Sequence, residues 1–202
     1  MDDKAALYAD TLKEICNMGS GSAAARLSKM INKKVEAFVP EAYITNVQPD
    51  ASEVIKEDGA MVIFEAEFFS EEKEKGKVYL FFNSESVMEL IDGIMGSAIC
   101  DEEMEESVII EVGNIVASSI ITAIANFLEK KVLLSPPKMA VEAPEAVVDS
   151  AIAEQFEETG CALFAHALIG VEGSSISMQM FLFPHFDLVK EIWRKARLST
   201  SE

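Results

Sequence analysis

An internal repeat constrains the fold of this chain more than any other feature of its sequence. Residues 10–40 align without a gap to residues 107–137, at a shift of 97 positions. Several identities recur in this alignment: Glu14 and Glu111, Asn17 and Asn114, Ser22 and Ser119, the Lys-Lys-Val runs at 33–35 and 130–132, and Pro40 and Pro137. Similarity at a fixed spacing indicates a supersecondary unit that occurs twice. We therefore predict a single domain, residues 1–202, made of two repeats of about 1–97 and 98–202.

The alignment continues beyond these segments with slightly larger shifts. It pairs 61–69 with 161–169, 77–83 with 177–184, and 86–95 with 187–196. Each copy starts with a helical pattern, followed by a break and a second helical stretch, at 22–32 and at 119–129. A strand then begins at the Lys-Lys-Val run and passes the proline. Two strands rich in Val, Phe, Ile and Leu follow, and a helix closes the unit.

This pattern predicts the fold class. Short loops between strands favour antiparallel pairing, and helices grouped against an antiparallel sheet give an α+β fold. We expect a duplicated helix-helix-β-β-β-helix unit with pseudo-twofold symmetry, in which the two copies share one sheet or one core. Residues 48–60 and 144–160 contain prolines and several acids, so we expect loops or loose helices there.

The charge of the chain excludes some classes of partner. Its 202 residues are half apolar and carry a net charge of −18. A nucleic acid would be repelled by this charge, and so would an anionic membrane surface. The three cysteines, Cys16, Cys100 and Cys161, form no C-x-x-C motif, so reduced thiols are the simplest interpretation. The acidic N-terminal stretch has no apolar signal segment, and we expect a cytoplasmic protein.

One stretch, 108–128, is long and apolar enough to span a membrane. Glu111, Asn114 and Asn126 interrupt it, and a glutamate in the middle of a span would be costly. We therefore expect a largely buried helix of a protein without membrane spans.

The stretch GSGSAA at 19–24 fits the dinucleotide-binding pattern G-x-G-x-x-A. That fingerprint requires a strand before the glycines. Here Tyr8, Leu12 and Ile15 precede them at helical spacing. The other repeat has no glycine at any of these positions. We therefore expect Gly19 and Gly21 to mark a helix break or a close contact between two helices, and no nucleotide site.

A polar stripe precedes the glycines. Asp10, Glu14 and Asn17 lie at i, i+4 and i+7, so a helix places them on one face, and Ser107, Glu111 and Asn114 repeat the arrangement. A solvated helix face is the simple alternative, but the second stripe stands out from a nearly all-apolar helix. An amide group can donate and accept, and so can hold a water at a fixed angle. An ionised glutamate accepts hydrogen bonds and pairs with lysine.

These residues resemble the signature of the CheC–CheX–FliY group of bacterial chemotaxis phosphatases, D/S-x3-E-x2-N-x22-P. The signature is met in full by two sets of residues: Asp10, Glu14, Asn17 and Pro40, and Ser107, Glu111, Asn114 and Pro137. Two motifs in one chain of this length are similar to the CheC type within that group.

The resemblance implies dephosphorylation of the phospho-aspartate of the response regulator CheY. It implies that Asn17 and Asn114 orient the attacking water and that Glu14 and Glu111 pair with the regulator's lysine. Asp10, Ser107, Pro40 and Pro137 would then be supporting residues. No cofactor of its own is implied, because Mg²⁺ is supplied by the phosphorylated regulator. The resemblance also implies a monomer, with the deamidase CheD as a further partner.

Three other interpretations stay open beside the phosphatase. The stripe could be a docking face of a non-catalytic adaptor for CheY or CheD, or part of a flagellar-switch component. Cys16 could be a nucleophile, although no partner base or phosphate loop accompanies it.

His166 and His185 lack metal-ligand spacing, which favours packing or solvent contact.

Overall fold

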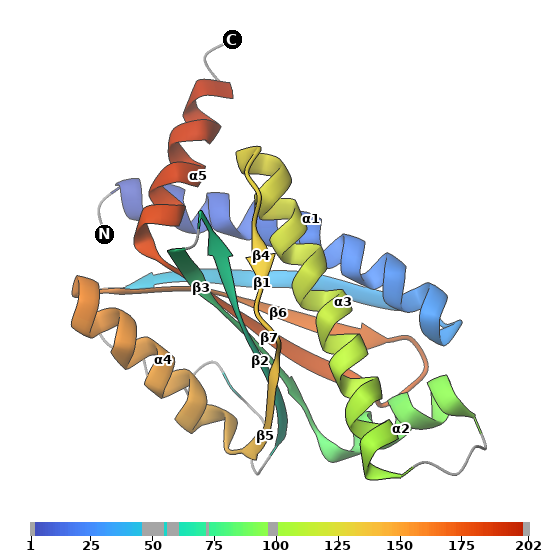
Figure 1. Ribbon diagram of the computed structural model, residues 1–202. Coiled ribbons are helices and arrows are strands. Elements are labelled where there is room, and N and C mark those ends of the chain that lie inside the picture. The colour runs from blue at the N-terminus through green and yellow to red at the C-terminus, as the bar shows by residue number, and fades with distance from the viewer. Residues whose placement is uncertain (1–2, 46–54, 56–60, 72, 97–100, 200–202) are drawn as a thin grey trace.

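The computed structural model describes residues 3–45, 55, 61–71, 73–96 and 101–199. Five helices and seven strands follow one another in this part of the chain (Figure 1): α1 (Asp3–Ile31), β1 (Val35–Thr45), β2 (Met61–Ser70), β3 (Lys73–Phe82), α2 (Ser84–Met95), α3 (Glu102–Leu128), β4 (Leu133–Leu134), β5 (Lys138–Glu142), α4 (Pro144–Thr159), β6 (Ala162–Val171), β7 (Ser177–Pro184) and α5 (Phe186–Ser199).

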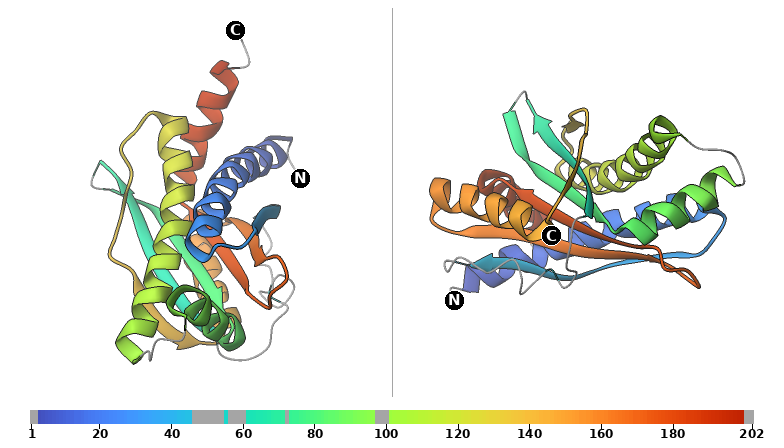
Figure 2. Two further views of the ribbon diagram at one scale, coloured as in Figure 1. Left: turned by 90° about the vertical axis from the view of Figure 1, so that its right-hand side faces the viewer. Right: turned by 90° about the horizontal axis from the view of Figure 1, so that it is seen from below.

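The strands form one antiparallel sheet between two layers of helices. α1, α2, α3 and α5 share an apolar core with one face of the sheet, and α4 packs on the other face. Figure 2 shows α1 and α3 together on their side of the sheet. The α+β class and the antiparallel sheet packed against long helices are confirmed.

The strand order has an internal symmetry. The order is β1-β6-β7-β3-β2-β4, and β5 also pairs with β2. The strands of the two predicted repeats correspond as β1 to β4, β2 to β6 and β3 to β7. If each strand is replaced by its counterpart, the same order is obtained when the sheet is read from the opposite edge. At the centre, Leu80 of β3 lies opposite Met180 of β7, and these residues match in the sequence alignment. A twofold relation between the repeats would produce this arrangement.

The register of the outer strands corrects one part of the predicted alignment. Phe64 of β2 lies opposite Leu80, and Ala167 of β6 lies opposite Met180. Phe64 therefore matches Ala167, three positions beyond the predicted Phe164. Sixteen positions separate Phe64 from Leu80, but only thirteen separate Ala167 from Met180, and an alignment that shifts both strands by the same amount cannot absorb that difference. Because side chains alternate across a strand, the odd shift moves Phe164 to the α4 side of the sheet.

The predicted break in each long helix is wrong. α1 and α3 are single helices of 29 and 27 residues. Both end at matching positions, where Asn32 and Glu129 adopt left-handed φ angles of 52° and 55°. The glycines of α1 are tolerated because packing of a buried face contributes more to a helix than local propensity does.

Two further observations concern residues after the long helices, where loops or loose helices were expected at 144–160. Residues 144–159 form the helix α4, with Pro144 in its first turn and Gly160 as its left-handed C-cap. Proline is favourable at that position because the first turn has no intrahelical partner for its missing N–H. In the second repeat the predicted strand is split into β4 and β5 at Ser135–Pro137. The segment 48–60 lies outside the described residues, apart from Ile55, which is buried.

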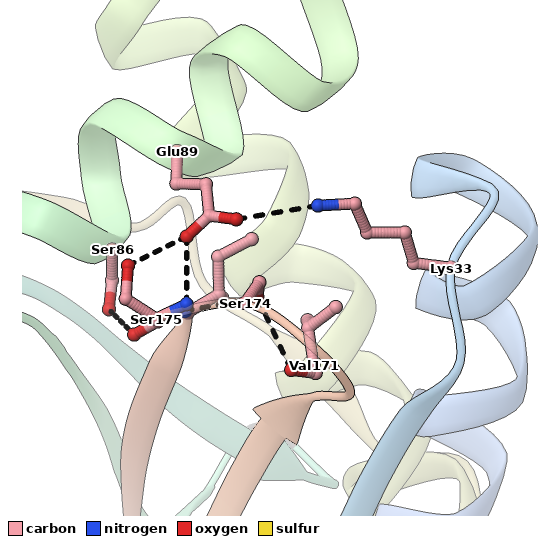
Figure 3. A network of polar contacts seen from close by, with 7 residues as sticks. Lys33, Ser86, Glu89, Val171, Ser174 and Ser175 are labelled. Carbon is pink, nitrogen blue, oxygen red and sulfur yellow. Dashed lines mark hydrogen bonds and ion pairs between the residues drawn. The ribbon is translucent and has the colours of Figure 1, made fainter.

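The Lys-Lys-Val runs link the end of each long helix to a short helix. Lys33 pairs with Glu89 of α2 at 3.3 Å, and Lys130 pairs with Glu191 of α5 at 3.0 Å. Figure 3 shows the first of these pairs, where Glu89 also accepts hydrogen bonds from the backbone N–H and hydroxyl of Ser175. These bonds lower the pKa of Glu89, first through the Ser175 hydroxyl and then through its N–H and Lys33.

Candidate functional site

The first polar stripe lies on the outer face of α1. Asp10 and Glu14 are exposed, and Asn17 is half-buried. The inner face of the same turns packs against the core through Leu12, Ile15 and Cys16, which are at most 3% exposed. Burial of this apolar face fixes the rotation of the helix, so the stripe has to face away from the sheet.

The second stripe repeats these exposures on α3. Ser107 and Glu111 are exposed, and Asn114 is half-buried. The Ser107 hydroxyl donates to the Glu103 carbonyl at 2.8 Å, within the helix. The opposite face is buried through Ile109, Val112 and Val116. In both helices, therefore, a carboxylate and a carboxamide are presented on a rigid element with a buried back.

The two helices contact each other just beyond the asparagines. A methyl group added at Gly19 would lie 2.5 Å from the Cα of Ile120, so the backbones approach closely at this point. The predicted helix contact is confirmed for Gly19. Gly21 instead faces open space. The stretch from Gly19 to Ala24 lies in the interior of α1, with helix before it and no preceding strand, as expected for a sequence without a dinucleotide loop.

An arginine of α1 reaches across this contact to the second stripe. Arg26 Nη1 donates to the hydroxyls of Ser118 and Ser119 at 3.3 and 3.2 Å. Ser118 lies one helical turn beyond Asn114 on the same face of α3. The repeat alignment places Ala123 at the position that matches Arg26. Sequence reasoning missed Arg26 because it searched for residues that are identical in the two repeats. Arg26 occurs in only one of them.

Cys16 does not have the environment of a nucleophile. Its side chain is fully buried, and desolvation raises the pKa of the thiol to about 12. A thiol attacks as its thiolate, which burial strongly disfavours. The interpretation of Cys16 as a nucleophile is wrong. Cys161 is half-buried, and Cys100 lies outside the described residues.

The two prolines of the signature and His166 lie where packing or backbone geometry accounts for them. Pro40 lies in the edge strand β1, where the register shifts between Phe38 and Glu41, and Pro137 is half-buried between β4 and β5. Proline is compatible with both places because neither requires a ladder hydrogen bond from its nitrogen. His166 is buried, stacks on Phe181 and bonds to the side chain of Gln179 at 3.1 Å. Within the described ranges, no group of three or more His, Cys, Asp or Glu side chains could hold a metal ion.

One helix, Glu102–Leu128, is long and apolar enough to cross a membrane, and 61% of its most apolar window is buried inside the protein. This burial is that of a core helix. It agrees with the expectation that the apolar face of this segment packs against the protein.

Comparison with known proteins finds similarity to one family. The model of the CheC-like family matches residues 7–44 and 104–140, so that both stripes fall inside the matched segments. The CheY-P phosphatase CheC of Bacillus subtilis (strain 168) is 24% identical over 194 residues, which cover 91% of each chain.

Solved structures share the fold. FliY of Thermotoga maritima superimposes with a TM-score of 0.66 at 21% identity, covering 92% of this chain and 93% of that one. The middle domain of FliM from H. pylori superimposes with a TM-score of 0.62 at 12% identity, and the match covers 96% of this chain and 99% of that one. CheX from Desulfovibrio desulfuricans superimposes with a TM-score of 0.57 at 10% identity, and the match covers 85% of this chain and 99% of that one. Taken with the two stripes, the two matched segments and the Bacillus subtilis relative support the assignment of the chain to the CheC-like family.

Proposed function

We propose that the protein is a phosphatase that hydrolyses the aspartyl phosphate of a CheY-like response regulator. One observation carries the proposal: each of two helices with a buried back has an exposed glutamate and, three residues later, a half-buried asparagine on its outer face. The name of the Bacillus subtilis relative, a CheY-P phosphatase, supports the same substrate.

The chemistry requires little beyond positioning. In the reaction the oxygen of water forms a bond to phosphorus, and the bond between phosphorus and the carboxyl oxygen breaks. The aspartate leaves as carboxylate with the bonding electron pair, and the proton of the attacking water passes to the phosphate product. An acyl phosphate has a good leaving group, so the water needs orientation more than it needs a strong base.

The asparagine suits that orienting role. Its carbonyl oxygen accepts a hydrogen bond from the water, and its amide group donates one to a phosphoryl oxygen. It has no titratable proton near neutral pH, so it does not act as a general base. The rigid helix reduces the entropy that would be lost when the side chain enters the regulator's site.

The glutamate suits a docking role beside it. Glu14 and Glu111 precede the asparagines by three residues, so each lies next to its asparagine on the helix surface. An ionised carboxylate pairs with a lysine of the regulator. Mg²⁺, in this proposal, is bound by the regulator. We further propose that the protein acts in the cytoplasm as a monomer and that CheD is a second partner.

The test is phosphate release from a phosphorylated CheY-like regulator, with and without the protein. We expect acceleration by the wild type and a return to the regulator's own rate in the Asn17→Ala, Asn114→Ala double variant. Asn126→Ala is the matched control, because Asn126 is an exposed asparagine on α3 outside the stripe. Full activity of the double variant would refute the water-orienting role.

The same assay separates the phosphatase from the adaptor. An adaptor would bind the regulator without accelerating phosphate release, and its affinity would survive the loss of both asparagines. The fold is shared with FliM domains, so co-purification with flagellar motor proteins would be the evidence for a switch component.

A further inference from the structure

The proposed substrate is an anion, and the protein that must receive it is strongly acidic. With a net charge of −18, the surface opposes the approach of a phosphorylated carboxyl group. A cation beside a site would offset this repulsion locally, by an amount that depends on the salt concentration. The two stripes differ in this respect, because α1 supplies a guanidinium to the second stripe.

The position of Arg26 is fixed by two hydroxyl groups. The hydroxyls of Ser118 and Ser119 donate their own protons to the Ile115 carbonyl, at 3.3 and 2.6 Å. Each hydroxyl has one proton to donate, so each is left as an acceptor for Arg26 Nη1. The guanidinium is thereby held over α3, one turn beyond Asn114.

The rest of the Arg26 head group is available to a partner. The residue is exposed, and among the described residues no carboxylate lies within ion-pair distance of it. A guanidinium has five N–H donors, and its fork matches phosphate and carboxylate oxygens. The two serine contacts use only one of its nitrogens.

The first stripe has no equivalent. Ala123 occupies the position that matches Arg26, and Gly21 occupies the position of Ser118. The space above Gly21 is open. The first site therefore lacks a guanidinium supplied from the other long helix and one of the two hydroxyls that would hold it, although Lys13 lies on α1 itself, one turn before Asn17.

We propose that Arg26 is a substrate-binding residue of the second site, so that the site at Glu111 and Asn114 is built from both halves of the chain. This inference rests on the proposed phosphatase function. The guanidinium contacts the anionic surface of the docked regulator around its phosphorylated aspartate. The guanidinium thus lowers the KM of the second site, and this contribution weakens as salt is added.

The test uses variants in which one site works at a time. Asn17→Ala leaves the second site and Asn114→Ala leaves the first. Phosphate release is measured over a range of regulator concentrations at low and at moderate salt. In the Asn17→Ala background, Arg26→Ala should raise KM about two- to five-fold, the effect of one exposed charge pair. It should also weaken the salt dependence of KM, and Arg26→Lys should restore part of both.

A control variant and a variant that adds the missing residues to the first site complete the experiment. Lys29→Ala removes another exposed cation of α1 and should leave both sites unchanged. In the Asn114→Ala background, Ala123→Arg combined with Gly21→Ser should lower the KM of the first site. An Arg26→Ala effect that is equal at both sites, or absent at the second, would overturn the inference while phosphate release still supports the phosphatase. No release by the wild type would overturn both.

Discussion

Cys16 of α1 and Gly113 of α3 occupy matching positions of the two repeats, and both are buried beneath the polar stripe of their helix. In the sheet, the larger side chain belongs to the half that has the smaller residue on its helix. Phe64 lies in the half beneath Gly113, whereas the matching position of the other half is Ala167. A methyl group on Gly113 would collide with the ring of Phe64. One half thus packs a glycine against a large ring, and the other half has a cysteine and an alanine at the matching positions.

The comparison shows which part of the repeat can vary. Several combinations of large and small side chains fill a core to the same density, so the inner faces of the two helices differ. On the outer faces, the glutamate and asparagine are identical in both halves. Core packing does not require that identity, because the glutamates are exposed and the asparagines are only half-buried. The phosphatase chemistry that we propose would account for it.

The largest effect on stability is expected at the contact between the two long helices. Gly19→Ala would place a carbon 2.5 Å from the backbone of Ile120, so the helices must separate. We expect a loss of about 3 kcal/mol in the free energy of unfolding, the upper range for overpacking. Gly21→Ala is the control, because its surroundings are open, and it should stabilise the helix by about 0.5–1 kcal/mol. Equal effects in denaturant unfolding would contradict the close contact.

The next effect tests the core of the second half. Gly113→Ala should destabilise the protein by about 1–3 kcal/mol, because the added methyl group overlaps the buried ring of Phe64. Phe64→Leu in the same chain should recover part of that loss, since it removes the colliding ring. If the two changes were simply additive in denaturant unfolding, Gly113 and Phe64 would not be coupled.

The smallest effect concerns the link between α1 and α2 shown in Figure 3. The folded-state pKa of Glu89 lies below its ordinary value of 4.5, owing first to its hydrogen bonds with Ser175. Its contribution to stability is therefore present above the unfolded pKa and is lost as pH falls through the folded pKa. Glu89→Gln should melt below the wild type at pH 6, and the difference in Tm should shrink by pH 3.

The control for that prediction is Glu85→Gln, which changes the same charge at an exposed position of the same helix. A difference in Tm between wild type and Glu89→Gln that stays constant from pH 6 to pH 3 would contradict the role of the ionised carboxylate.

Sequence analysis predicted the parts of the molecule that periodicity determines. The strands of β2, β3, β6 and β7 and the exposure of Glu14 and Glu111 follow from residue spacing alone. The sequence-based prediction failed where contacts between distant segments determine the local structure or the role of a residue. Gly19 suggested a break, but it lies within an unbroken helix, where its missing side chain allows the close approach of Ile120. Arg26 could not be assigned, because its role depends on which serines the crossing of α1 and α3 brings within reach.

The central claim is that each of the two stripes forms a phosphatase site of its own. Phosphate release from a phosphorylated regulator at saturating concentration, measured for Asn17→Ala, Asn114→Ala and the double variant, tests it most directly. We expect each single variant to retain part of the wild-type acceleration, the two parts to add up to the whole, and the double variant to retain none. A single substitution that abolishes all acceleration, or a double variant that keeps it, would contradict the account.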